Sequence, residues 1–147
     1  MQIGDDLDTA TVQRVSDSFD SQGLMRHLGA TLVGIRAGEV TIRLPFRPEL
    51  TQHDGYFHAG SSAAIADSAG GYAAYTLFQP DSAVLTVEFK LNLLNPAQGD
   101  WLDAVGRVIK PGRTLTVCQL DVWGVTGDRR THVATGLQTL IQMRPKA

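Results

Sequence analysis

The sequence has little cysteine, little net charge and no long apolar run. It contains one cysteine, Cys118, in 147 residues, which excludes an internal disulfide framework and fits a reducing compartment. Because its neighbours are typical of a strand, we expect Cys118 to be a packed thiol. The net charge is −2, without the basic excess of nucleic-acid-binding proteins. No apolar run approaches the roughly 20 residues that span a bilayer. We therefore expect neither a nucleic-acid partner nor a membrane partner.

We expect no signal peptide at the N-terminus. Its residues, MQIGDDLDTATVQ, are acidic and lack a basic region followed by an apolar one. The composition, 43% hydrophobic and 19% charged, is that of a globular protein, and the chain is long enough to bury one core. We predict a single cytoplasmic domain over residues 1–147, with an N-terminal helical segment at 1–24.

Hydrophobic periodicity divides the chain into helices and strands. Apolar residues recur at helical spacing over 9–22, which predicts an amphipathic helix. Residues 30–45 fit two strands joined at Gly38-Glu39. Four further strands, separated by turn-forming residues, are predicted to follow in a meander: 84–94, 101–109, 114–125 and 131–143.

The stretch 59–78 predicts a buried central helix. It is rich in alanine, glycine and serine and is apolar on nearly all sides, so other structure must surround it. In 84–94 the odd positions are apolar and the even ones polar, which places the odd side chains on the core and Thr86 on the outward face. Together the elements predict an α+β fold, in which one antiparallel sheet of about six strands wraps around a long central helix.

Asp67 is the only formally charged residue between Ala59 and Pro80, and it has two interpretations. It could be the N-cap of a helix that restarts at DSAGG. If the helix is continuous, the carboxylate must be paired or reach a wet cleft, because an isolated buried charge costs much free energy. Its neighbours on the same helix face are all glycine or alanine, which would let another backbone or a ligand approach closely.

The start of this helix offers complementary chemistry. Its first N–H groups lack internal partners and lie at the positive end of the helix dipole, so Ala59 and Gly60 could donate to a developing oxyanion. The amide of Gln52 could donate to the same carbonyl. Ala59 and Asp67 are eight residues apart, or about 12 Å at about 1.5 Å per residue. One substrate carbonyl cannot reach both groups of one chain, so an enzymatic interpretation predicts a symmetric dimer with composite sites.

The run Gln52…Gly55…His58-Ala59-Gly60…Asp67 resembles the signature N/Q-x-x-G-x-x-H-G-G-x(7)-D of hotdog-fold acyl-CoA thioesterases, in the PaaI-like and 4-hydroxybenzoyl-CoA thioesterase group. The resemblance covers roughly residues 25–143, and LTVEFKLNLLNPA is similar to the family's strand after the central helix. The chain departs from the signature at Ala59, where the family has its first glycine. Because only an N–H is needed there, we expect activity to survive. We expect the added methyl group of Ala59 to narrow the approach to the thioester.

The resemblance implies hydrolysis of an acyl-CoA to a free acid and coenzyme A, without a metal or redox cofactor. Coenzyme A itself is part of the substrate and is not a cofactor here. Asp67 would attack the thioester or activate the water that does. The Ala59 N–H would be the oxyanion donor, Gln52 would orient the carbonyl or the water, and Thr86 would hold the water.

The resemblance also implies residues that bind substrate. Gly55, His58 and Gly60 belong to the loop and helix start, where His58 would hydrogen-bond the backbone. Lys110 and Arg113 match a hairpin whose basic residues often meet the phosphates of coenzyme A, although a solvated turn would carry the same charges. We expect a homodimer, with a tetramer as the larger assembly.

Two other functions stay open at this point. A hotdog protein could bind acyl-CoA without turnover, although its retained acid argues against a site without chemistry. An acyl-thioester dehydratase or hydratase would need a histidine paired with an acid. His58 is the candidate, and Asp67 lies too far along the helix to pair with it directly.

Overall fold

The structure is a computed structural model that describes residues 1–145. The helices are α1 (Thr9–Ser21), α2 (Gly23–Leu28) and α3 (Ala59–Tyr75), with a short 3-10 turn η1 (Pro48–Leu50). The strands are β1 (Gln2–Ile3), β2 (Thr31–Arg36), β3 (Glu39–Pro45), β4 (Ala83–Leu93), β5 (Trp101–Lys110), β6 (Leu115–Thr126) and β7 (Arg129–Met143). No helix among these residues is long and apolar enough to cross a membrane.

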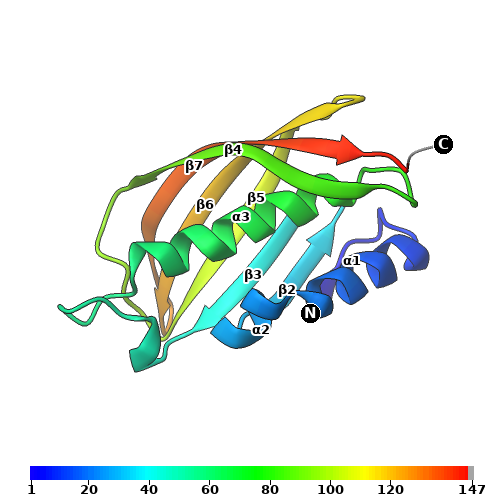
Figure 1. Ribbon diagram of the computed structural model, residues 1–147. Helices are drawn as coiled ribbons and strands as arrows, with labels where there is room; N and C mark the ends of the chain where they lie inside the picture. Colours follow the sequence, from blue (N-terminus) through cyan, green and yellow to red (C-terminus); the bar gives the residue numbers. More distant parts are fainter. Residues whose placement is uncertain (146–147) are drawn as a thin grey trace.

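The strands form one curved sheet, and α3 crosses its concave face (Figure 1). Apolar side chains of the helix, such as Ile65 and Ala69, pack against the inward side chains of β3, β5 and β6. At Gly106 of β5 the helix and the sheet approach closely, because a Cβ there would overlap the backbone of Ala69 and Gly70. The small residues of α3 therefore let the sheet wrap tightly around the helix, which confirms the predicted α+β architecture.

The sheet has seven strands in the order β1-β2-β3-β5-β6-β7-β4, rather than about six. The additional strand is β1, which lies parallel to β2 and has only two residues, too few to show an alternating pattern. All other neighbouring strands are antiparallel. The N-terminal segment thus contributes a strand as well as helix.

The predicted four-strand meander is wrong for its first strand. Only β5, β6 and β7 follow one another as hairpins, whereas β4 pairs with β7 at the edge of the sheet. The loop 94–100 carries the chain across the end of the sheet, so that β5 joins β3. Strand alternation does not encode which neighbour a strand takes when a loop of this length precedes it.

The prediction that Thr86 faces outward is also wrong. Cross-strand partners project to the same side of a sheet, and Thr86 pairs with the buried Leu140. A β-bulge between Thr86 and Glu88 then shifts the alternation by one residue, so Phe89 pairs with the buried Gln138. Thr86 and Phe89 therefore both face the helix, although they are three residues apart.

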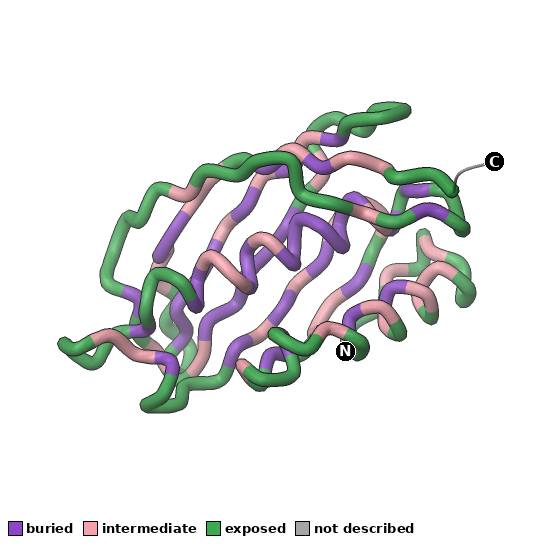
Figure 2. Tube along the Cα trace, in the orientation of Figure 1, coloured by how far each residue is buried: buried purple, intermediate pink, exposed green. Residues whose placement is uncertain are grey.

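The edge strand β4 is largely exposed, unlike the interior strands (Figure 2). Three of the side chains predicted to face the core are in fact about half exposed: Leu85 at 57%, Val87 at 55% and Leu93 at 58%. A long edge strand that exposes apolar side chains and unpaired backbone groups is suited to pair with another strand.

Candidate functional site

The first turn of α3 leaves one backbone donor free. His58 is the N-cap residue, and its Nδ1 accepts a hydrogen bond of 2.8 Å from the Gly60 N–H. The N–H groups of Ser61 and Ser62 point to the His58 carbonyl. Among residues 1–145, the N–H of Ala59 has no acceptor, and Ala59 is exposed. An exposed, unpaired donor at the positive end of a helix can bind an anionic oxygen.

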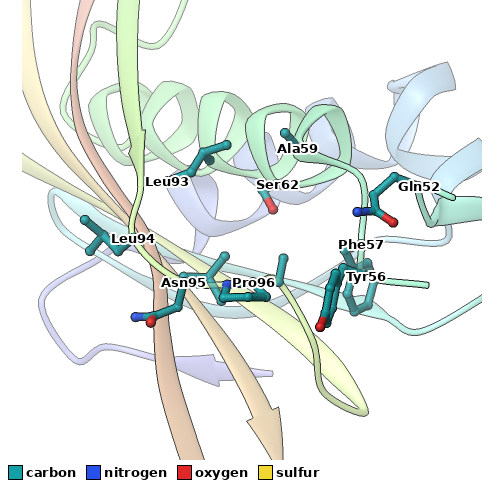
Figure 3. A pocket seen from close by; sticks show the side chains of 11 residues that line it. Gln52, Tyr56, Phe57, Ala59, Ser62, Leu93, Leu94, Asn95 and Pro96 are labelled. Atoms are coloured by element: carbon teal, nitrogen blue, oxygen red, sulfur yellow. The ribbon is translucent and has the colours of Figure 1, made fainter. Parts of the chain in front are cut away.

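The preceding loop orients the Gln52 amide. Its Oε1 accepts a hydrogen bond from the Asp54 N–H, which leaves Nε2 as the uncommitted end of the amide. Gly55 takes a positive φ of 84°, a conformation that a glycine adopts without strain. Figure 3 shows the Gln52 nitrogen on the side of its amide that faces the helix start, and Gln52 and Ala59 line the same hollow. Both predicted oxyanion donors thus lie at one end of α3.

These groups line a hollow of about 440 Å³, which we call the helix-start pocket. Its wall combines loop residues with the end of β4, and includes Gln52, Ala59, Ser62, Leu93 and Pro96 (Figure 3). The Ser62 hydroxyl is buried and has no hydrogen-bond partner within residues 1–145. A mostly apolar wall with a few polar groups is typical of a site for a small organic molecule.

Asp67 lies two turns further along the helix and is half-buried. Its Oδ1 accepts a hydrogen bond of 2.6 Å from Thr86 Oγ1 on β4 and one of 2.7 Å from Gln138 Nε2 on β7. Gln138 Nε2 also lies 3.1 Å from Thr86 Oγ1 and 3.1 Å from the Asp67 carbonyl oxygen. The helix is continuous through this point, which excludes the N-cap interpretation of Asp67.

Asp67 opens onto a second hollow of about 360 Å³, the Asp67 pocket, whose lining includes Ala64, Gly71, Leu85 and Thr86. The Asp67 pocket and the helix-start pocket share no lining residue. The structure therefore brings Thr86 to Asp67 and Gln52 to Ala59, but it does not bring the two pairs together within one chain. This separation is what the eight-residue spacing predicts.

The other predicted residues lie elsewhere. His58 and Gly60 line a smaller hollow beside the helix start, together with Leu28 and Leu50. Lys110 and Arg113 flank the exposed turn between β5 and β6, and neither lines the helix-start pocket or the Asp67 pocket. The geometry of this monomer thus gives them no contact with either half of the site.

Gln138 is a site residue that the sequence reasoning missed. It is only 1% exposed, in a strand whose core-facing positions 134, 136 and 140 hold Ala, Gly and Leu. A polar residue at a core-facing position of a strand is the signal that could have found it, because a buried amide needs partners.

Comparisons with known proteins show which family the chain resembles. A family model described as the thioesterase superfamily matches residues 54–130. A protein of Halobacterium salinarum with a provisional esterase name is 34% identical over 124 residues, which cover 81% of this chain and 81% of that protein.

Solved structures extend the agreement to the fold. A thioesterase family protein from Silicibacter pomeroyi is 41% identical, with a TM-score of 0.90 over 92% of this chain and 99% of that chain. The PaaI protein of the Escherichia coli phenylacetic acid degradation operon has a TM-score of 0.82 over 96% of this chain and 97% of that chain. Its identity is 18%, so this second likeness concerns the fold alone. The predicted hotdog architecture is confirmed.

Proposed function

Because this chain belongs to the thioesterase superfamily, we propose that it hydrolyses an acyl-CoA to a free acid and coenzyme A, at sites that two subunits build together. The family membership confirms the predicted resemblance and the predicted class, a thioester hydrolase. The substrate, the roles of individual residues and the dimer are the proposed part.

The observation that supports the proposal best is the state of the Asp67 carboxylate. Both of its hydrogen bonds within residues 1–145 end on Oδ1, so Oδ2 is uncommitted beside the Asp67 pocket. An uncommitted carboxylate oxygen can act as a general base or as a nucleophile. Thr86 Oγ1 donates its proton to Asp67, which leaves its oxygen able to accept a hydrogen bond from a water molecule.

Two routes lead from this arrangement to the same products. In one, Asp67 takes a proton from water as the water oxygen adds to the thioester carbonyl carbon. In the other, Asp67 itself adds and forms an anhydride that water then cleaves. In both, the C–S bond breaks and the coenzyme A thiolate leaves and takes up a proton. The Ala59 N–H and the Gln52 amide would stabilise the negative charge that develops on the carbonyl oxygen.

The two halves of the site would meet across a two-fold axis. Thr86 lines the Asp67 pocket and Leu93 lines the helix-start pocket, and both belong to the edge strand β4. Antiparallel pairing of two β4 strands about an axis near Lys90 would bring Thr86 of one copy close to Leu93 of the other. The Asp67 pocket of one subunit then adjoins the helix-start pocket of its neighbour, and the exposed apolar side chains of β4 become buried.

A hydrolysis screen tests the proposal. The purified protein is offered short, medium, long and aromatic acyl-CoAs, and release of the free thiol is followed. We expect at least one to be cleaved, and Asp67→Asn to lower kcat by about 10²- to 10⁴-fold, with an unchanged melting temperature. Failure of the wild type to cleave any thioester, or undiminished turnover by Asp67→Asn, would refute the assignment.

A further inference from the structure

Gln138 on β7 is one of two sheet residues that hydrogen-bond the proposed catalytic acid, the other being Thr86 on β4. We propose that Gln138 is a positioning residue, which holds one oxygen of the Asp67 carboxylate so that the other oxygen faces the Asp67 pocket. The inference rests on the proposed function for its catalytic meaning, and on the hydrogen bonds of the Gln138 amide for its structural basis.

The orientation of the Gln138 amide follows from its surroundings. Nε2 lies within 3.1 Å of three oxygen atoms, which are Asp67 Oδ1, the Asp67 carbonyl and Thr86 Oγ1. A flipped amide would turn Oε1 towards a carboxylate and a carbonyl, both of which can only accept. The amide nitrogen must therefore face Asp67, and its bond to the carboxylate is charge-assisted.

The oxygen end of the Gln138 amide indicates that this side chain does more than fill space in the core. Gln138 Oε1 is buried and has no hydrogen-bond partner within residues 1–145. Leaving a buried acceptor unpaired costs about 1–3 kcal/mol, so an apolar side chain would suit the same space better if packing were its only purpose. The donor end is what distinguishes glutamine from such a side chain.

The helix is shaped to admit this amide. A Cβ at Gly70, one turn after Asp67, would overlap Gln138 Oε1 and Leu120. Absence of a side chain at Gly70 thus lets β7 come close enough for the amide to reach the Asp67 carbonyl as well as its carboxylate. The amide is anchored to the helix backbone at the same time as it holds the side chain.

Two strands then fix one carboxylate oxygen. Thr86 from β4 and Gln138 from β7 both donate to Oδ1, and these two donors also contact each other. Rotation of the carboxylate would break both bonds. Gln138 is not among the residues that line the Asp67 pocket. It therefore acts on the reaction through Asp67 and has no contact with the space that a substrate would occupy.

The first experiment removes the amide donor of Gln138 and keeps a side chain of similar size. For Gln138→Met we expect kcat to fall about 10- to 100-fold, since misplacing a reacting group by about 1 Å can cost about 10²-fold, while KM stays within about threefold. Gln142→Met is the matched control, because Gln142 lies in the same strand and its amide donates to Ser82, away from Asp67. We expect that control to retain wild-type kcat.

The second experiment uses a side chain that can donate only when protonated. Gln138→Glu keeps the length of the side chain, and its neutral acid can still bond Oδ1, but its ionised form repels the Asp67 carboxylate. Its kcat, relative to wild type at the same pH, should fall as the pH rises from about 5 to about 8, whereas the ratio for Gln138→Met should stay flat. A purely structural role predicts flat ratios for both variants, and that result would overturn the proposal.

Failure of the proposed function can be told apart from failure of this inference. If the wild type cleaves no thioester, the melting temperature still reports the contact between positions 67 and 138. Gln138→Glu should lose thermal stability from about pH 5 to about pH 8, and the double variant Asp67→Asn/Gln138→Glu should recover it, because an asparagine can donate to the new carboxylate. No recovery in the double variant would overturn the inference, whatever the activity.

Discussion

The start and the middle of α3 are built in different ways. At the helix start, the side-chain hydrogen bonds of His58 and Gln52 reach residues only two positions away in the chain. At Asp67, the partners Thr86 and Gln138 lie 19 and 71 residues away. The helix-start half presents the Ala59 N–H and the Gln52 amide, which local turn geometry positions. The Asp67 half presents one side chain that distant strands hold, so its geometry depends on the packing of the whole sheet.

The largest effect after loss of Asp67 itself is expected from removing the Ala59 N–H. Ala59→Pro deletes this donor at the first helical position, where proline is well tolerated, and His58 already has an extended backbone that suits a following proline. Loss of one oxyanion donor should lower kcat about 10²- to 10³-fold, with little change in melting temperature. Steady-state kinetics and thermal unfolding of the same preparation measure both quantities.

Ala59→Gly is the matched control for this variant. It keeps the N–H and restores the family's glycine, so kcat should stay within about threefold of wild type. Equal activity of the proline and glycine variants would contradict the oxyanion role of the helix start.

A smaller effect is expected at Gly70, where the Asp67 half depends on packing. In Gly70→Ala the new methyl group overlaps Gln138 Oε1 and Leu120, so the free energy of unfolding should fall by about 1–3 kcal/mol. Displacement of the Gln138 amide should also lower kcat. Denaturant unfolding measures the loss of stability.

Gly71→Ala gives the contrast in the same turn. A Cβ there would meet Leu140 at 3.7 Å, which is ordinary van der Waals contact. Alanine is the better helix former, so stability should be unchanged or rise by up to about 1 kcal/mol. Equal losses in both variants would contradict the specific overlap at Gly70.

The smallest effect concerns Cys118, which packs beneath the Asp67 half with its Sγ 3.5 Å from the Gly70 carbonyl. Burial raises the pKa of this thiol from its ordinary 9.0 to about 12. Because the fold disfavours the thiolate, the contribution of Cys118 to stability is complete below about pH 9 and is lost as the pH rises towards 12. A thiol-reactive dye at neutral pH should label only the unfolded protein, and rapid labelling of the native protein would contradict the buried position.

The same contrast explains what the sequence could predict. The helix-start half is a contiguous run from Gln52 to Gly60, so its residue types and spacing could be recognised directly. The strands were predictable from alternation, but the place of β4 at the sheet edge was not. The sequence of the loop after β4 does not encode which strands β4 and β5 pair with.

The bulge after Thr86 reversed the phase of the alternation and so misplaced that side chain. Gln138 escaped notice because its meaning depends on a contact 71 residues away. Its only local mark is a polar residue among core-facing positions of β7, which could have been read from the strand pattern.

Mixing two inactive variants tests the central claim, that the helix-start half and the Asp67 half of one chain serve different sites of the dimer. Ala59→Pro and Asp67→Asn subunits are denatured together in equal amounts and refolded. In a mixed dimer, one site carries both defects and the other carries neither. Half of the dimers should be mixed, so activity should return to about a quarter of the wild-type value. Recovery to that level supports a site shared between subunits, whereas a mixture as inactive as either variant alone would contradict it.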